Sequence, residues 1–276
     1  MRILITGAGG QLGRGLQRAL PAHELVALPR AQLDITRPDD VLAALAAHRP
    51  QWLLNAAAYN AVDAAEKDHD AAFAINERGP RVLARATAAA GVTLLHVSTD
   101  YVFDGEADAP YDEDARPDPQ SVYGKSKLAG ELAVRDENPC HYIVRTAWVY
   151  APQGKNFPLT MLELAKRGPV RVVNDQTGSP TYAPHLAAAL ARLIEARPAF
   201  GTYHIAGSGA ATWYELTVAL FEAMKIKVAV TPVTTAEFPR PAPRPRYSVL
   251  TTIREPRIEL PPWRDGLAAL AKELGA

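Results

Sequence analysis

The chain has 276 residues, of which 48% are apolar, and its 30 Lys and Arg residues balance its 30 Asp and Glu residues. A protein that grips nucleic-acid phosphates needs a basic excess, so this neutral balance argues against a nucleic-acid partner. A single cysteine, Cys140, excludes an internal disulfide and a cysteine-based metal centre. The sequence shows no signal-peptide pattern and no apolar run of about 18 residues, so we expect a cytoplasmic protein without a membrane partner.

The first half of the chain alternates short apolar runs with helical patterns. Strands are predicted at Arg2–Thr6, Glu24–Leu28, Trp52–Ala56, Thr93–Val97 and Tyr142–Thr146. Helices are predicted at Gln11–Leu20, Pro38–His48, Asp70–Ala90 and Val122–Asp136. Strands separated by helices imply βαβ units. The sequence therefore predicts an α/β fold, a Rossmann-like doubly wound parallel sheet with helices on both faces.

The second half is less regular and predicts a smaller C-terminal lobe. Helices are expected at Asn156–Arg167, Ala183–Ala196 and Thr212–Met224, and extended segments at Val170–Val173 and Thr202–Ile205. Thr212 and Glu215 have the spacing of a capping box. Eight of the 23 prolines lie between Pro232 and Pro262, which predicts a constrained loop. That loop is either a surface linker or a rigid cover over a site.

A glycine motif, GAGGQLG, follows the first predicted strand and opens the first helix. Gly7 permits the sharp turn, Gly10 lets a pyrophosphate approach the backbone, and Gly13 lets helix and strand pack closely. The helix N-terminus offers unpaired N–H groups to phosphates. The second strand is followed by Arg30, which suits a 2′-phosphate better than a 2′-hydroxyl. The motif therefore predicts a dinucleotide site that favours NADPH, with NADH as the second choice.

Tyr123 and Lys127 lie four residues apart on a predicted helix, which places them on one face. Thr99 lies in STDYVF, just after the fourth strand, at the sheet edge where open α/β folds bind ligands. A ketone that accepts a hydride also needs a proton. Tyr123 would supply that proton as general acid, the Lys127 ammonium would lower the pKa of the phenol, and Thr99 would orient the carbonyl oxygen.

These segments resemble the extended short-chain dehydrogenase/reductases and, more narrowly, the dTDP-4-dehydrorhamnose reductase family. The glycine motif and the Tyr-Lys motif indicate only the superfamily. The narrower resemblance rests on AAAYNAVDAAE from Ala56, STDYVFDG from Ser98 and RTAWVY from Arg145, and the match continues through DQTGSPTY from Asp175 and RPAPRPRYSVL from Arg240. The resemblance implies an enzyme that uses NADPH to reduce the 4-keto group of dTDP-4-dehydro-6-deoxy-L-mannose to dTDP-L-rhamnose.

The resemblance also implies residue roles. The cofactor would be bound by Gly7, Gly10, Gln11, Leu12, Gly13, Arg30, Asp34, Ile35, Ala56, Ala57, Ala58, Tyr123 and Lys127. Within that set, Asp34 and Ile35 would flank the adenine, and Lys127 would bind the nicotinamide ribose. The substrate would be bound by Val62, Thr99, Tyr101, Trp148 and Arg244, the last facing its diphosphate. Packing in the core is the alternative role for Trp148.

The expected domains are an NADP-binding unit over residues 1–155, with return segments around 170–206, and a substrate lobe over 207–276, to which 156–169 contribute. Some bacterial relatives form dimers bridged by magnesium on glutamates, one of them on the first helix. Gly15 stands at that position here, so we expect no metal site and either a monomer or a homodimer. Two other functions remain open, namely another nucleotide-sugar 4-ketoreductase or epimerase, and a non-catalytic NADP-binding regulatory subunit.

Overall fold

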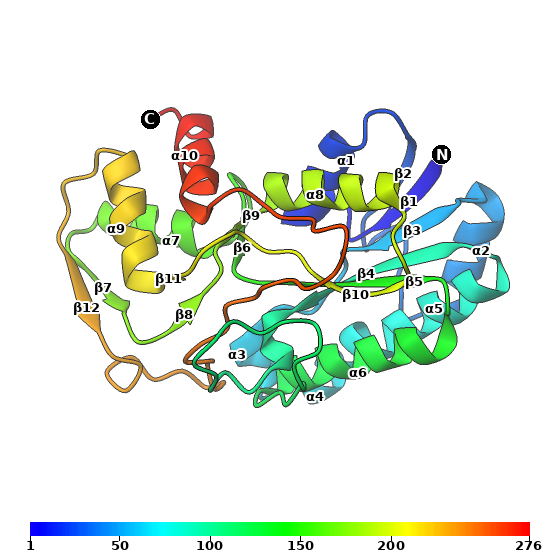
Figure 1. Ribbon diagram of the computed structural model, residues 1–276, viewed down its shortest axis with the longest axis horizontal. Coiled ribbons are helices and arrows are strands. Elements are labelled where there is room, and N and C mark those ends of the chain that lie inside the picture. Colours follow the sequence, from blue (N-terminus) through cyan, green and yellow to red (C-terminus); the bar gives the residue numbers. More distant parts are fainter.

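The computed structural model describes residues 1–276 and is built on a six-stranded parallel sheet (Figure 1). Its strands run in the order β2-β1-β3-β4-β5-β10. Their bounds are Glu24–Leu28, Arg2–Thr6, Trp52–Asn55, Thr93–Thr99, His141–Thr146 and Gly201–His204. The order reverses between β1 and β3, and the carboxyl ends of the strands at such a point form the binding crevice of doubly wound folds.

Helices cover both faces of this sheet, which confirms the predicted fold class (Figure 1). One face carries α1 (Gln11–Ala19) and α8 (Ala183–Ala196), and the other carries α2 (Pro38–His48), α5 (Gly79–Ala89) and α6 (Val122–Glu137). Successive side chains of a strand point to opposite faces. Ile3 and Ile5 accordingly pack under α1 and α8, whereas Leu4 packs with the helices of the other face.

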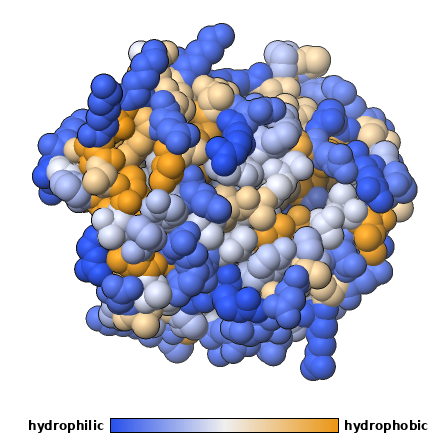
Figure 2. Space-filling model, turned by 60° about the vertical axis from the view of Figure 1, so that its left-hand side comes forward, coloured by the Kyte–Doolittle hydropathy of each residue, from blue (hydrophilic) through white to orange (hydrophobic).

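The smaller lobe has its own apolar core around Tyr150, Leu216 and Leu220. It contains the helices α7 (Phe157–Ala165), α9 (Trp213–Ala223) and α10 (Trp263–Glu273). Its two-stranded sheets pair β6 (Val149–Tyr150) with β9 (Thr181–Tyr182), β8 (Thr177–Gly178) with β11 (Ala211–Thr212), and β7 (Val170–Val173) with β12 (Val230–Val233). Figure 2, with this lobe turned forward, shows apolar and weakly polar residues across the middle of the face and hydrophilic residues around it.

Two elements differ from the sequence expectation. The extended segment at 170 pairs with β12 in the smaller lobe, and the return into the large sheet is made by α8 and β10. The helix expected over 70–90 consists of α4 (His69–Phe73), a π-helical segment η1 (Ala74–Arg78) and α5. Pro80 has no N–H to continue a regular ladder, so the backbone widens just before it. No helix in the structure is long and apolar enough to cross a bilayer.

Candidate functional site

The loop between β1 and α1 lies directly against the end of β3. Gly7 has a φ of +65°, and a Cβ on it would lie 2.6 Å from the backbone nitrogen of Ala57. A Cβ on Gly13 would collide with the carbonyl of Gly7. Gly10 caps α1 without a side-chain hydrogen bond, so the first-turn N–H groups have no capping partner. This bare, glycine-lined helix N-terminus fits a dinucleotide diphosphate.

The segment after β2 places an arginine and a carboxylate at the edge of the sheet. Arg30 is exposed, and its charge contributes to lowering the pKa of Asp34. The larger causes of that lowering are the N–H and hydroxyl of Thr36, which bond the Asp34 carboxylate at 3.0 and 2.7 Å. Ile35 is buried in the core, in close contact with Gly79 of α5, so its side chain serves packing first.

The three residues expected to be catalytic meet at the carboxyl end of β4. Thr99 is the last residue of β4, and its hydroxyl donates to Asp100 at 2.9 Å. Ser121 caps α6 by accepting from the N–H of Gly124 at 3.1 Å, which starts the helix so that Tyr123 faces β4. Lys127, one turn further along α6, is buried and donates to the carbonyl of Val97 at 2.7 Å.

Burial dominates the electrostatics of this set. It raises the pKa of Tyr123 to about 12, against which a hydrogen bond from Thr99 acts to lower it and the charge of Asp100 to raise it. Burial lowers the pKa of Lys127 to about 8, and Glu131 opposes that change. Lys127 is not among the groups that shift the pKa of Tyr123, because its amine is turned toward β4. Tyr123 therefore keeps its proton at neutral pH, as a general acid requires.

Side chains from three elements gather around the phenol of Tyr123. Tyr101 lies edge-on to the Tyr123 ring at 5.4 Å, and Val62 of α3 (Val62–Ala65) packs in the same cluster. Asp63 of α3 forms an ion pair with Arg244 at 2.7 Å. The structure thus brings the expected substrate residues Val62, Tyr101 and Arg244 to the catalytic set.

Trp148 lies in the smaller lobe, where it follows the end of β5. Its backbone has a φ of +46°, a conformation that costs a bulky residue free energy. Its ring lies flat on the ring of Trp213 with centroids 3.3 Å apart and an interplanar angle of 3°. The stack extends to Phe157, whose ring is 4.4 Å from that of Trp213. Trp148 is half-buried, and Gly178 also lies against its ring.

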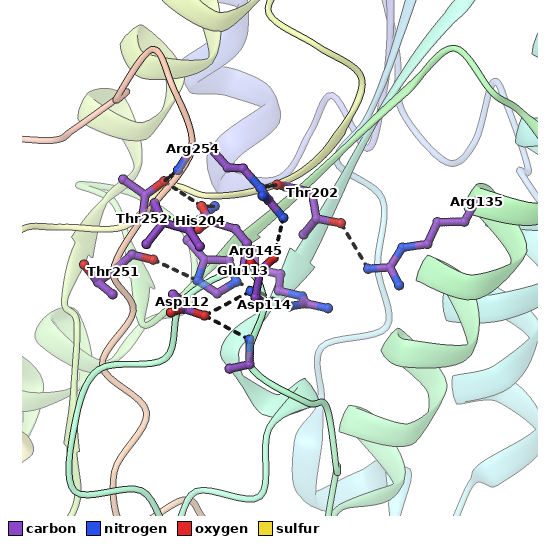
Figure 3. A network of polar contacts seen from close by, with 12 residues as sticks. Asp112, Glu113, Asp114, Arg135, Arg145, Thr202, His204, Thr251, Thr252 and Arg254 are labelled. Atoms are coloured by element: carbon purple, nitrogen blue, oxygen red, sulfur yellow. Dashed lines mark hydrogen bonds and ion pairs between the residues drawn. The ribbon is translucent and has the colours of Figure 1, made fainter.

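The proline-rich segment is not a free linker, because it is tied to the large domain at several points. Pro245 lies against Gly105, where a Cβ would come within 2.5 Å of it. Figure 3 shows the second attachment, in which the Glu113 carboxylate accepts from Thr252, Ile253 and the backbone of His204. His204 lies on β10, so the segment is held to the edge of the large sheet. Of the two interpretations of the sequence, the structure supports a rigid loop beside the site.

Sequence reasoning did not single out Asp63 or Trp213. The available signal for Asp63 was its acidic side chain directly after the expected substrate residue Val62. The structure adds that His96 lies 3.3 Å from the Lys127 amine. Gly15 is buried against Ala183 and Ala187 of α8. No group of three His, Cys, Asp or Glu side chains is placed to hold a metal ion.

Comparison with known proteins gives the same picture over the full chain. The family model described as "RmlD substrate binding domain" matches residues 1–276. A probable dTDP-4,6-dihydroxy-2-methyloxan-3-one 4-ketoreductase of Streptomyces antibioticus is 45% identical over 98% of this chain and 93% of its own. A dTDP-4-dehydrorhamnose reductase of Streptomyces griseus is 44% identical over 100% and 93%.

A solved structure has nearly the same backbone. It is a dTDP-4-dehydrorhamnose reductase of Bacillus anthracis in complex with NADP, 39% identical, with a TM-score of 0.95 over 99% of both chains. The glycine-lined crevice, the residues gathered at the end of β4 and these full-length matches all agree. The chain belongs to the RmlD substrate-binding-domain family, which is the family of the dTDP-4-dehydrorhamnose reductases.

Proposed function

We propose that the protein uses NADPH to reduce the 4-keto group of dTDP-4-dehydro-6-deoxy-L-mannose and so forms dTDP-L-rhamnose. The observation that carries this proposal is the meeting of Thr99, Tyr123 and Lys127 at the end of β4, beside the glycine-lined crevice between β1 and β3. Full-length relatives named for this reaction support the substrate. NADPH supplies the hydride when it is bound.

The roles of the chain's own residues follow from their positions. Tyr123 donates the proton to the carbonyl oxygen that becomes the 4-hydroxyl, and Thr99 orients this oxygen by turning to it the hydroxyl that donates to Asp100 in the structure. Lys127 binds the nicotinamide ribose from one turn further along α6 and, in its ammonium form and with the cofactor in place, lowers the pKa of the phenol. The backbone N–H groups of Gln11, Leu12 and Gly13 face the cofactor diphosphate, while Ala56, Ala57 and Ala58 line its path past β3.

On the substrate side, Val62, Tyr101 and the exposed part of Trp148 contact the deoxysugar, while Arg244 faces the diphosphate. An aromatic face suits the apolar side of a 6-deoxy sugar, and a guanidinium suits phosphate oxygens. A 4-ketoreductase acting on a different nucleotide sugar is the second candidate. The Streptomyces antibioticus relative, which is named for such a reaction, favours it.

The deciding experiment incubates the purified protein with dTDP-4-dehydrorhamnose and NADPH, follows the oxidation of the cofactor, and identifies the product. Conversion to dTDP-L-rhamnose with one NADPH consumed for each sugar supports the proposal and excludes an epimerase. The Tyr123→Phe variant should keep its affinity for NADPH and lose most turnover. Binding of NADPH without oxidation by any deoxysugar ketone would support a regulatory subunit instead.

A further inference from the structure

A buried chain of hydrogen bonds runs from β1 through β3 and β4 to the amine of Lys127. The hydroxyl of Thr6 donates to Asn55 Oδ1 at 2.7 Å, and Asn55 Nδ2 lies 2.9 Å from His96 Nδ1. His96 Nε2 in turn lies 3.3 Å from Lys127 Nζ. All four side chains are at most 2% exposed, so water does not supply alternative partners.

A backbone N–H group fixes which atoms donate and which accept in this series of hydrogen bonds. The N–H of Ala57 donates to Asn55 Oδ1 at 3.2 Å, and since a backbone N–H cannot accept, the amide of Asn55 cannot be reversed. Asn55 Nδ2 is therefore a donor, and His96 Nδ1 must accept from it. A neutral imidazole that accepts at Nδ1 carries its proton on Nε2. His96 thus presents an N–H to Lys127.

Lys127 Nζ must accept a hydrogen bond from this N–H. An ammonium group has three donors and no acceptor, so it would place donor against donor at 3.3 Å. A neutral amine accepts from His96 with its lone pair and still donates to the carbonyl of Val97 at 2.7 Å. We propose that His96 is a positioning residue whose Nε2–H holds Lys127 as an amine that exchanges a proton near neutral pH, in place of a fixed cation.

The charged and titratable surroundings agree with this arrangement. Burial, then the charge of Lys127 and that of His141, lowers the pKa of His96 well below its ordinary value, so the ring is neutral. Glu131 is the charged group that favours the ammonium form of Lys127, and its carboxylate is already engaged by Arg145 at 2.7 Å. The proposal deepens the proposed function, because it sets the protonation state of the residue that would bind the nicotinamide ribose.

Two NMR measurements on the full chain test the proposal without turnover. Labelling histidine with ¹⁵N identifies the tautomer of His96, whose signal is the one missing from His96→Gln. Labelling lysine with ¹³C at Cε follows the titration of Lys127, whose signal is missing from Lys127→Arg. We expect the Nε2–H tautomer and a midpoint for Lys127 of about 8, against the ordinary lysine value of ~10.4.

Variants of the hydrogen-bonded residues then test how the proton on His96 affects Lys127. Asn55→Asp still accepts from Thr6 and Ala57, but its carboxylate cannot donate to His96 Nδ1, so the ¹⁵N signal of His96 should change because Nδ1 now carries a proton. In this variant the midpoint of Lys127 should rise by about one pH unit or more. The basic limb of the pH profile of NADPH oxidation should shift to higher pH with it. Thr6→Val removes a hydroxyl but no donor to His96, so the tautomer of His96 and the midpoint of Lys127 should both stay unchanged. His96→Gln, whose amide can accept from Asn55 and donate to Lys127, should also retain the lowered midpoint.

An Nδ1–H tautomer in the unmodified protein would overturn the proposal, and so would an ordinary titration of Lys127. These NMR readouts do not depend on which sugar the enzyme reduces. Failure of the proposed function would instead show as a lowered Lys127 midpoint in a protein that does not reduce the deoxysugar ketone.

Discussion

Asp63 and Arg244 form an ion pair of 2.7 Å between residues 181 positions apart in the chain. The same carboxylate accepts from the backbone N–H of Ala242 at 3.3 Å and lies 3.9 Å from the guanidinium of Arg240. One acidic side chain on α3 therefore sets the direction of two cations in the proline-rich segment. Arg244 is only 17% exposed, so its orientation depends strongly on this partner.

Asp63→Ala should weaken binding of the nucleotide sugar, because Arg244 loses the partner that directs it. We expect the KM for the sugar substrate to rise about tenfold, equivalent to ~1.4 kcal/mol, with the KM for NADPH unchanged. Steady-state kinetics with each substrate varied in turn measures both values. Glu163→Ala, which removes an exposed pair with Lys166 on α7, is the matched control. An unaltered sugar KM in Asp63→Ala would contradict the role given to this pair.

Trp213→Ala should affect the sugar site through Trp148. Removing the ring that lies 3.3 Å from Trp148 takes away the support that holds this residue in its left-handed conformation. We expect a loss of stability of about 3 kcal/mol together with a higher KM for the sugar, whereas Trp213→Phe should retain most of both. Urea denaturation and sugar kinetics test the pair of variants. Equal sugar KM values in the alanine variant and the unmodified protein would show that the Trp148–Trp213 stack does not contribute to substrate binding.

Arg30→Ala should change which cofactor the protein prefers. The exposed guanidinium at the end of β2 is placed to meet a 2′-phosphate, which NADH lacks. The KM for NADPH should rise about tenfold while the KM for NADH stays the same. Lys67→Ala, another exposed cation, serves as the control. If both KM values are unaltered, another residue reads the 2′-phosphate.

Glu131→Gln should be among the most destabilising single changes in the large domain. Glu131 and Arg145 are at most 1% exposed and paired at 2.7 Å, and the pKa of the carboxyl is lowered by Arg145 against the effect of burial. Losing one charge leaves the other buried without its partner, at a cost of about 3–5 kcal/mol. Glu137→Gln, on the same helix but with its exposed partner Arg85, should cost far less. Similar losses in both variants would refute this ranking.

Acid should destabilise the attachment of the proline-rich segment through His204. Burial lowers the pKa of this imidazole to about 4, with Arg145 acting in the same direction and Glu113 against it. A group whose pKa is depressed by folding contributes stability that is fully present above its unfolded value, about 6.5, and is lost as the pH falls toward its folded value. The free energy of unfolding should therefore decline between about pH 6.5 and 4, and the decline should be smaller in His204→Gln. Parallel pH profiles for both proteins would exclude His204 as the cause.

The strands of the large sheet were predictable because buried parallel strands are continuous apolar runs such as Arg2–Thr6, which the structure reproduces residue for residue. The helix after β3 was predicted as one unbroken element, and the π-helical segment within it depends on Pro80 and on tertiary contacts of Asn76. Asn76 bonds both backbone groups of Tyr59 and the hydroxyl of Ser126. The sequence pattern contains no sign of such partners.

The short strands of the smaller lobe were largely invisible for a related reason. β6, β8, β9 and β11 have two residues each, and each pairs with a segment more than 30 positions away. Helix α10 was also not anticipated, because it follows directly on the proline-rich segment and starts after Pro262 without a side-chain cap. In the site, spacing along α6 predicted that Tyr123 and Lys127 share a face. The contact between Asp63 and Arg244 joins distant segments, so only the folded chain reveals it.

Glu131 stands four residues after Lys127 on α6, and through Arg145 and His204 it connects with the attachment point of the proline-rich segment (Figure 3). One buried series of polar contacts therefore joins α6 to the attachment of the proline-rich segment. Under the proposed function, we expect substitutions at Trp148 or Val62 to change the preferred sugar at a smaller cost in stability than substitutions in this buried series.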